Sequence, residues 1–408
     1  MERKQIPVEE LQFGMYVAEL DRPWTETPFM YQGFHLTSEE QLAMLKTHCK
    51  HVFVDPDRTK AAPAVEKKRP PPPPAAAVTS FKIRGSTRYP QTAPVETEFK
   101  HADTVYSQSV TTIGELLRPL EKPGGVLDGK EVKESVTRLT DSVVRNPDAL
   151  LLVTRLREKS AHAHARALQV SIYMIVFARF LELEREELEL LGLLGLLQDI
   201  GKTRLPATLL EKAGALTPEE VALARKHVEY SEQILSETPA IPPRLPALAL
   251  LHHERQDGSG YPRGLKADAI GLYGSMAAIT DTFDALTAAR SYAETLSPSS
   301  ALSYLYKERG AGFHADLVEQ FIQCVGVFPV GSVVELNSGE TGIVITQNLV
   351  RRLKPRVMIV LDAQGQPMRP HKILDLEKDP KVRPDEPYKI RRTLEQTRLQ
   401  VDPREFFA

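Results

Sequence analysis

The sequence from His252 to Pro262 reads HHERQDGSGYP, and it is the anchor from which the rest of the chain is interpreted. Two adjacent histidines and a glutamate end a helical segment, and a glycine-rich loop carrying Tyr261 follows them. Neutral imidazole nitrogens beside carboxylate oxygens are donors that divalent iron, manganese or zinc accept. The loop combines backbone freedom with an aromatic ring that can close over a base. The stretch therefore predicts a metal site beside a mobile, ligand-covering loop.

Three further segments carry residues of the same kind. Asp199 and Lys202 end an apolar helix in the sequence DIGK, and His227 lies within a later helix. Asp281 precedes Asp284 by three residues, which places both on one helical face. A shared carboxylate can bridge two ions, paired ions suit in-line attack on a phosphodiester, and Lys202 could meet a non-bridging phosphate oxygen. The set predicts a metal-dependent phosphodiester site in a helical domain.

Each feature has an ordinary structural explanation when it stands alone. A single histidine such as His227 is more often a partly buried structural residue, and helix ends commonly carry histidines such as His252. The Asp281/Asp284 pair would usually be a solvated face, and Tyr261 before a proline and after glycines is usually part of a turn. We prefer the functional interpretation because all of these features occur together and in this order.

The run from about residue 156 to residue 328 resembles the HD-GYP family, and it covers a little over 40% of the chain. The string at 252–262 matches the family signature in full. Three shorter strings support the resemblance, namely DIGK at 199–202, LTPEE at 216–220 and DTFDAL at 281–286. The segment FGMYV at 13–17 resembles a small domain of unknown function that often precedes HD-GYP domains.

The resemblance implies a mainly α fold, an HD-domain helical bundle, that hydrolyses cyclic di-GMP to pGpG or GMP at a centre of two or three metal ions. It implies iron or manganese as the cofactor, held by Asp199, His227, His252, His253 and Asp281. It also implies a catalytic role for Asp199 and Lys202, and ligand contacts from Lys202, Tyr261 and Arg290.

Two ligand positions of the family are substituted in this chain. The family has a histidine before Asp199 where this chain has Gln198, and an amide is a weak ligand for a transition metal. A second family histidine, counted back without gaps, falls on Arg166, whose guanidinium stays protonated and has no lone pair to donate. Both positions belong to one ion, which Asp199 and Asp281 would also hold. We therefore expect partial occupancy or absence of the metal.

Other residues bear on how severe this loss is. His162 lies one turn before Arg166, where some family members carry an extra glutamate ligand, and a slip in the register would promote His164. Either histidine could restore part of the site. A basic residue that often follows Arg290 in the family is Ala293 here, which thins the expected phosphate contacts.

The charges expected around the substituted ligand positions predict a specific role for Arg166. Removing an ion from between Asp199 and Asp281 leaves carboxylates facing each other, and burying unpaired charge is costly. We predict that the guanidinium takes the place of the ion and hydrogen-bonds Asp281, Asp199 or both, at about 2.7–2.9 Å. The alternative is that Arg166 extends into solvent.

Composition and periodicity divide the chain into five segments. A capping box at Ser38–Gln41 supports a helix in the first segment, and one at Thr217–Glu220 supports a helix in the third. Consecutive prolines at 70–74 are typical of a linker. The expected segments are a small α+β domain at 1–57, a Pro/Ala-rich linker at 58–101, a helical domain at 102–328, a small β appendage at 329–378 and a tail at 379–408.

Bulk properties exclude several classes of protein. Lysine plus arginine total 52 against 54 for aspartate plus glutamate, so the chain lacks the basic character of a protein that binds a nucleic-acid polymer. Cys49 and Cys324 are far apart, which fits a reducing compartment. The N-terminus has no signal-peptide core, and no apolar run approaches the roughly 20 residues of a membrane span. We expect a bacterial cytoplasmic signal-transduction protein.

The sequence leaves three functions to weigh. We prefer a protein that binds cyclic di-GMP with weak or absent hydrolysis, and the first alternative is an active phosphodiesterase with an altered metal centre. A purely structural interaction domain is the third, and the intact Tyr261 loop, Lys202 and Arg290 argue against it. A protein partner would bind through the N-terminal domain or the loop at 258–262. The sequence does not indicate an oligomeric state.

Overall fold

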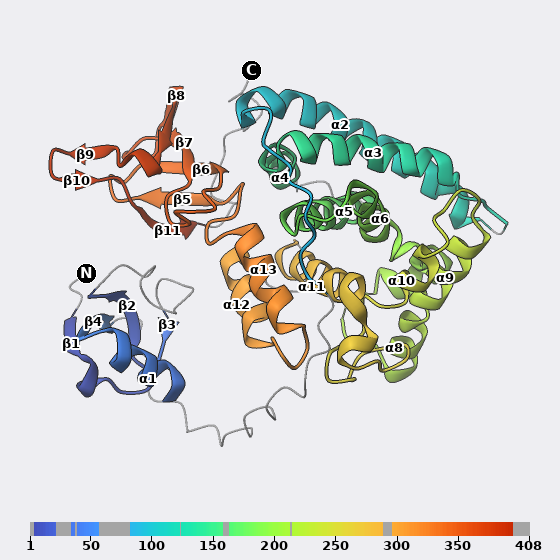
Figure 1. Cartoon of the computed structure of the whole chain (residues 1–408), viewed down its shortest axis with the longest axis horizontal. Helices are drawn as coiled ribbons and strands as arrows, with labels where there is room; N and C mark the ends of the chain where they lie inside the picture. Colours follow the sequence, from blue (N-terminus) through green and yellow to red (C-terminus); the bar gives the residue numbers. More distant parts are fainter. Residues whose placement is uncertain are drawn as a thin grey trace. The chain divides into compact units, whose positions relative to one another are not determined.

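The computed structural model describes residues 4–21, 34–36, 39–56, 82–122, 124–157, 163–212, 214–288 and 296–394. The chain divides into two units, Met1–Ala76 and Ala77–Ala408, which are coloured from blue to red along the sequence in Figure 1.

The first unit is a small antiparallel sheet with one helix. The strands lie in the order β1 (Lys4–Pro7), β4 (His51–Asp55), β2 (Tyr16–Leu20) and β3 (Phe34–His35), and the helix is α1 (Glu39–His48). Val17, Leu45 and Val52 have no exposed surface and form its core. The expected α+β character of this region is confirmed, while the expected capping residue Ser38 lies outside the described residues.

The second unit begins with an extended strap at residues 82–94. The strap lies along the loop between the two central helices, because the Gly85 amide donates to the Leu181 carbonyl at 2.8 Å and the Thr87 amide to the Glu182 carbonyl at 2.9 Å. The Arg84 guanidinium lies over the Phe180 ring at 5.3 Å. These residues were expected to belong to a linker, and this expectation needs correction because they are hydrogen-bonded to the helical bundle. Composition alone does not reveal hydrogen bonds made to a distant loop.

Twelve helices follow the strap in the described part of the second unit (Figure 1). They are α2 (Val95–Leu117), α3 (Gly129–Arg145), α4 (Pro147–Leu156), α5 (Ala163–Phe180), α6 (Arg185–Leu197), α7 (Ala207–Leu210), α8 (Pro218–Arg225), α9 (His227–Glu237), α10 (Leu245–Ala249), α11 (Gly271–Thr287), α12 (Pro298–Lys307) and α13 (Ala315–Val325). The capping box expected at Thr217–Glu220 is present at the start of α8. None of the described helices is long and apolar enough to cross a membrane.

The helices α5 and α6 form the centre of the bundle. Both are apolar around most of their circumference, as expected for helices buried on several sides. Gly195 permits their close approach, since a Cβ at this position would lie 2.8 Å from the Cα of Ser171. Helix α6 ends at Leu197, so the residues that follow, Gln198 and Asp199, emerge at one end of this packed core.

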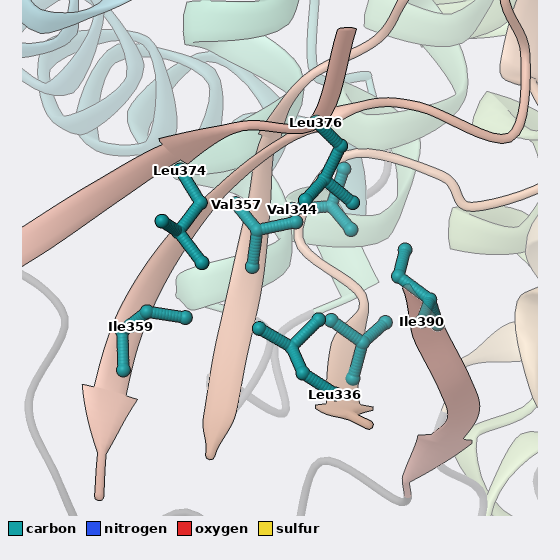
Figure 2. Close-up of a cluster of buried hydrophobic side chains, with 8 residues drawn as sticks. Leu336, Val344, Val357, Ile359, Leu374, Leu376 and Ile390 are labelled. Atoms are coloured by element: carbon teal, nitrogen blue, oxygen red, sulfur yellow. The ribbon is translucent and has the colours of Figure 1, made fainter. Parts of the chain in front are cut away.

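The C-terminal part of the second unit is a five-stranded antiparallel sheet. Its order is β11 (Ile390–Leu394), β5 (Val333–Leu336), β6 (Thr341–Thr346), β7 (Arg356–Leu361) and β8 (Pro367–Asp375), with a small ribbon of β9 (Lys381–Arg383) and β10 (Glu386–Pro387). Figure 2 shows the buried side chains of this sheet, among them Val344, Val357 and Ile390. They form a hydrophobic core of its own.

Two expected boundaries need correction. Helix α2 begins at Val95 rather than at residue 102, directly after Pro94. The region expected to be a tail from residue 379 contributes β9, β10 and β11, and β11 pairs with β5. Its local sequence is rich in charge, and the pairing that makes it a strand involves residues more than fifty positions away.

Candidate metal centre

Four side chains from separate segments converge at the end of α6. The potential ligand atoms of Asp199, His227, His252 and His253 all lie within 4.8 Å of one another. Asp199 follows α6, His227 is the first residue of α9, and the two adjacent histidines lie in the turn after α10. The structure thus brings together four of the five residues expected to bind metal.

Two of the imidazoles are fixed in orientation by backbone carbonyls. His227 Nδ1 lies 2.7 Å from the Ala224 oxygen, and His252 Nδ1 lies 2.8 Å from the Ala249 oxygen. A carbonyl only accepts, so each Nδ1 carries the proton, and in the neutral ring the lone pair is then on Nε2. Backbone carbonyls therefore set both rings with their metal-binding nitrogens toward the centre.

The atoms that face one another at the centre are all acceptors. His227 Nε2 lies 3.1 Å from Asp199 Oδ1, His252 Nε2 lies 3.5 Å from the same oxygen, and the two nitrogens are 3.5 Å apart. Asp199 Oδ1 is buried and has no hydrogen-bond partner unless an imidazole carries a second proton. Three lone pairs facing one another repel unless a cation lies between them, so this donor set fits a divalent ion.

The protonation of the centre favours metal binding. Burial alone would raise the pKa of Asp199, but the Lys202 ammonium opposes this, as do His227 and His252 whenever those rings carry a proton on Nε2, and the pKa lies well below its ordinary value. Lys202 Nζ lies 2.5 Å from Asp199 Oδ2. Burial and the neighbouring His252 lower the pKa of His253, which keeps that ring neutral. Metal ligands must be deprotonated, and the directions of the two shifts favour the deprotonated forms of Asp199 and His253.

A glycine allows the segments to meet. The 3₁₀ turn Ile200–Arg204 follows Asp199 directly, and a Cβ at Gly201 would overlap the carbonyl oxygen of His227. Ser231 on α9 completes the joint: its hydroxyl donates to the Gln198 carbonyl at 2.7 Å and accepts from the Gly201 amide at 2.8 Å. These contacts fix the start of α9, and with it His227, against Asp199.

The loop at 258–262 covers one side of the centre. The ring of Tyr261 stacks on His253 with 4.6 Å between centroids, and the Tyr261 amide donates to the His253 carbonyl at 3.2 Å. Buried Glu254 holds the continuation of the loop, since its two oxygens accept from the amides of Arg263 and Leu265 at 2.8 and 2.9 Å. Sequence analysis did not assign this role to Glu254, although the residue stands in the signature string.

The other side of the centre is different in chemistry. Gln198 is 1% exposed, and neither atom of its amide has a hydrogen-bond partner within the described residues. Arg166 Nε lies 2.6 Å from Oδ2 of Asp284, which is completely buried. Burial lowers the pKa of Arg166, but Asp284, Asp281 and Asp199 together more than offset it, so the net pKa is raised. The guanidinium therefore stays charged beside these carboxylates.

The predicted partners of Arg166 need correction. A hydrogen bond to Asp281, Asp199 or both was expected, whereas the bond in the structure is to Asp284. Asp284 is one helical turn beyond Asp281 on α11 and is the more deeply buried, so it gains more from a cation. The expectation that Arg166 carries its charge toward this group of carboxylates, rather than into solvent, agrees with the structure.

The remaining expected residues fall into two groups. Asp281 is not among the four converging side chains, although its charge reaches Arg166 and Tyr261 and contributes to raising both pKa values. His164 packs against α2, where its ring would contact a Cβ at Gly114, and it is not part of the group of four. Arg290, His162 and Ala293 lie outside the described residues.

One further cation borders the site and was missed by the sequence analysis. The guanidinium carbon of Arg225, at the end of α8, lies 4.8 Å from the centroid of the Tyr261 ring. Nothing in its local sequence, ARKH, distinguishes it from a solvated arginine, because the contact depends on how α8 meets the loop at 258–262.

Family profiles match three parts of the chain. The profile described as an HD domain matches residues 151–317, a domain of unknown function (DUF3391) matches 3–123, and a KOW domain associated with the HD domain matches 333–383. A cyclic di-GMP phosphodiesterase of Pseudomonas aeruginosa is 32% identical over 375 residues, which is 91% of this chain and 89% of that protein.

Other relatives are similar over a smaller share of their own length or at lower identity. The cyclic di-GMP phosphodiesterase response regulator RpfG of Xanthomonas campestris is 39% identical over 36% of this chain and 39% of its own length. A 3'3'-cGAMP-specific phosphodiesterase of Vibrio cholerae is 35% identical over 41% of this chain and 32% of its own length. Among solved structures, an HDG"Y"P protein from Bdellovibrio bacteriovorus aligns with a TM-score of 0.46 at 15% identity, over 78% of this chain and 98% of that one.

Proposed function

The chain belongs to the HD-GYP-type family of HD domains, whose members include cyclic di-GMP phosphodiesterases, and we propose that it binds cyclic di-GMP at the centre formed by Asp199, His227, His252 and His253. We further propose that it hydrolyses this ligand weakly or not at all. The observation that carries the second part is the ion pair between Arg166 and buried Asp284 beside an otherwise complete set of metal donors.

The reasoning rests on what each side of the centre can hold. The donor set of His227, His252 and Asp199 lacks protons between its facing atoms and fits iron or manganese. Arg166 is a permanent cation, so a second divalent ion next to it would meet repulsion instead of a ligand. Gln198 offers an amide in place of an imidazole. The arrangement supports one ion, while two would be needed to polarise both the attacking and the leaving oxygen.

The residues of the chain have separate tasks in ligand binding. A divalent ion at the donor set supplies Lewis acidity toward a phosphate oxygen. Lys202, 2.5 Å from Asp199, can turn one of its three N–H donors to a non-bridging oxygen of the same phosphodiester. Tyr261 keeps the loop at 258–262 beside the donor set through its stack on His253.

An active phosphodiesterase with an altered, single-ion centre is the alternative. The observation that favours it is the completeness of the donor set, because one ion and Lys202 could still polarise a phosphodiester. If turnover is absent, the bound state must have an output. We assign it to a protein partner of the N-terminal unit or of the loop at 258–262.

Binding and hydrolysis are to be measured on the same full-length preparation. Calorimetry with cyclic di-GMP in the presence of manganese or anaerobic ferrous iron gives the affinity, and anion-exchange chromatography of pGpG and GMP gives the rate. We expect measurable binding, with hydrolysis at least about a hundredfold slower than in the Pseudomonas aeruginosa relative, which corresponds to a loss of about 2.7 kcal/mol of transition-state stabilisation.

Restoring imidazoles provides the matched test. The double variant Arg166→His/Gln198→His should bind a second ion per chain and hydrolyse cyclic di-GMP faster than the native chain. The single variant Gln198→His, which keeps the guanidinium, should do neither. Rapid hydrolysis by the native chain with ordinary metals would show that the alternative is correct.

A further inference from the structure

We propose that Arg225 is a ligand-binding residue for a cyclic dinucleotide. One phosphodiester of the ligand lies at the metal donor set, and Arg225 binds the other. The inference rests on the function proposed above and adds a residue that the sequence motifs do not contain. It starts from the position of the guanidinium over Tyr261, at 4.8 Å from the ring centroid, with the same ring stacked on His253 at 4.6 Å.

The position of Arg225 is set by its place at the end of α8 and by one ring contact of its exposed side chain. It is the last residue of α8, which begins at a complete capping box, and it precedes His227 by two residues. A cation over an aromatic face is attracted by the quadrupole of the ring, and this holds the side chain at the border of the site. Tyr261 thus contacts both Arg225 and the metal-donor residue His253.

The charge of Arg225 is available to a ligand. Across the described ranges, no carboxylate lies within ion-pair distance of Arg225, and its side chain donates no hydrogen bond. Lys202, by contrast, already shares its charge with Asp199 at 2.5 Å. A guanidinium that rests on an aromatic face keeps its in-plane N–H donors free, and a pair of such donors matches two oxygens of a phosphate.

The chemistry of the ligand makes the two cations complementary. A cyclic dinucleotide carries two phosphodiesters across one macrocycle, so seating one at the donor set and Lys202 presents the other a short distance away. Among the residues that the structure describes, Arg225 is an unpaired cation at that border.

The test compares Arg225→Ala with Arg244→Ala in the full-length chain. Arg244 is a matched control, because its guanidinium also lies over a tyrosine, Tyr273, at 5.1 Å, but neither residue belongs to the donor set. We expect Arg225→Ala to weaken cyclic di-GMP binding by about tenfold or more and to flatten its dependence on potassium chloride. Arg225→Lys should retain part of the affinity, and Arg244→Ala should bind like the native chain.

Three ligands distinguish phosphate binding from base recognition. Because phosphate is common to all of them, Arg225→Ala should weaken cyclic di-GMP, 3'3'-cGAMP and cyclic di-AMP by the same factor, with melting temperature and bound manganese unchanged. Unchanged affinity, or a loss confined to the ligands that contain guanine, would overturn the inference. If the native chain binds none of the three, the proposed function fails and takes this inference with it, whereas a native chain that binds and an unaffected variant refute the inference alone.

Discussion

The two sides of the centre solve the same electrostatic problem in opposite ways. On one side, Asp199, His227 and His252 face one another with lone pairs and require a cation from solution. On the other, buried Asp284 faces Arg166, a cation supplied by the chain itself. The comparison teaches that buried carboxylates can be compensated either by an ion that the surrounding side chains would bind or by a permanent positive charge of the chain itself.

The two solutions differ in what they make available to chemistry. A bound ion has open coordination positions and accepts electron pairs from substrate, whereas a guanidinium has no empty orbital and can only donate hydrogen bonds. Arg166 therefore restores the charge balance without restoring Lewis acidity. On the proposed function, Arg166 would stabilise the fold without contributing to catalysis.

The largest effect is expected from removing an imidazole of the metal-requiring side. His252→Ala should lower the affinity for manganese by more than about a hundredfold, since loss of a ligand exceeds the ten- to hundredfold cost of losing a supporting contact. His101→Ala, at an exposed position of α2, is the control. Equilibrium dialysis with metal analysis measures the change, and equal affinity in the two variants would contradict a metal site at the donor set.

The second-largest effect is expected from breaking the ion pair between Arg166 and Asp284. Arg166→Ala removes the guanidinium from a completely buried carboxylate, and it should lower the free energy of unfolding by about 2–3 kcal/mol. This is less than for a fully buried pair, because the Arg166 side chain is 34% exposed. Urea denaturation of the metal-free protein measures the change.

A second ion pair in the same helical unit provides the control for Arg166. Arg157 is exposed to a similar degree, at 29%, but its partner Asp103 is 27% exposed. Arg157→Ala should therefore lower the free energy of unfolding by about 1 kcal/mol or less. Adding Asp284→Asn to Arg166→Ala should recover part of the lost stability. If Arg166→Ala and Arg157→Ala lower the free energy of unfolding equally, the guanidinium of Arg166 does not compensate a buried charge.

A smaller effect on stability is expected at Glu254, which holds the continuation of the loop at 258–262 beside the donor set. Glu254→Gln replaces one acceptor oxygen by a donor that faces a backbone amide, at a cost of about 1–2 kcal/mol. Hydrogen exchange of the Arg263 and Leu265 amides should accelerate while metal affinity stays the same. Glu229→Gln, on the exposed face of α9, is the control. Unchanged exchange at both amides would show that Glu254 does not hold the loop.

The smallest effect is expected at Asp148. Unlike Asp284, this carboxyl group has neighbouring arginines that compensate its charge only in part. Burial raises the pKa of Asp148 to about 7, although the Gln347 amide and the charges of Arg179 and Arg356 act against this. The folded-state value lies above the unfolded one, so the contribution of Asp148 to stability is lost as pH rises from about 4 to 7. Its side chain is partly accessible to water, and we expect a loss of about 1 kcal/mol.

Asp148→Asn tests this contribution directly. The variant should be more stable than the native chain at pH 8 and show little difference at pH 4, as measured by urea denaturation at both values. A variant equally destabilised at both pH values would mean that the charge of Asp148 is not the cause.

The metal-requiring side could be predicted from sequence because its signal is local. Adjacent histidines at 252 and 253, and an aspartate at the end of an apolar helix, mark ligands by residue type and by position in their elements. The capping box at Thr217 likewise depends on residues three positions apart. Such features are determined by short-range geometry and survive without knowledge of the packing.

The parts that could not be predicted depend on contacts between distant segments. Which carboxylate receives Arg166 is decided by the depth of Asp284 in α11, and the contact of Arg225 with Tyr261 by the way α8 meets a loop. The strap at 82–94 and strand β11 were misassigned for the same reason, because their hydrogen bonds reach the loop after α5 and strand β5.

The ion pair between Arg166 and Asp284 also has a consequence for evolution. A mutation that exchanges Arg166 for histidine removes the cation from a buried carboxylate before Gln198 has become a ligand, and it lowers stability. A mutation that first exchanges Gln198 for histidine places an imidazole beside a guanidinium that repels the incoming metal. Each single step is therefore disfavoured, and only the two exchanges together supply ligands for a second ion, so this ion pair opposes the stepwise gain of a second metal position.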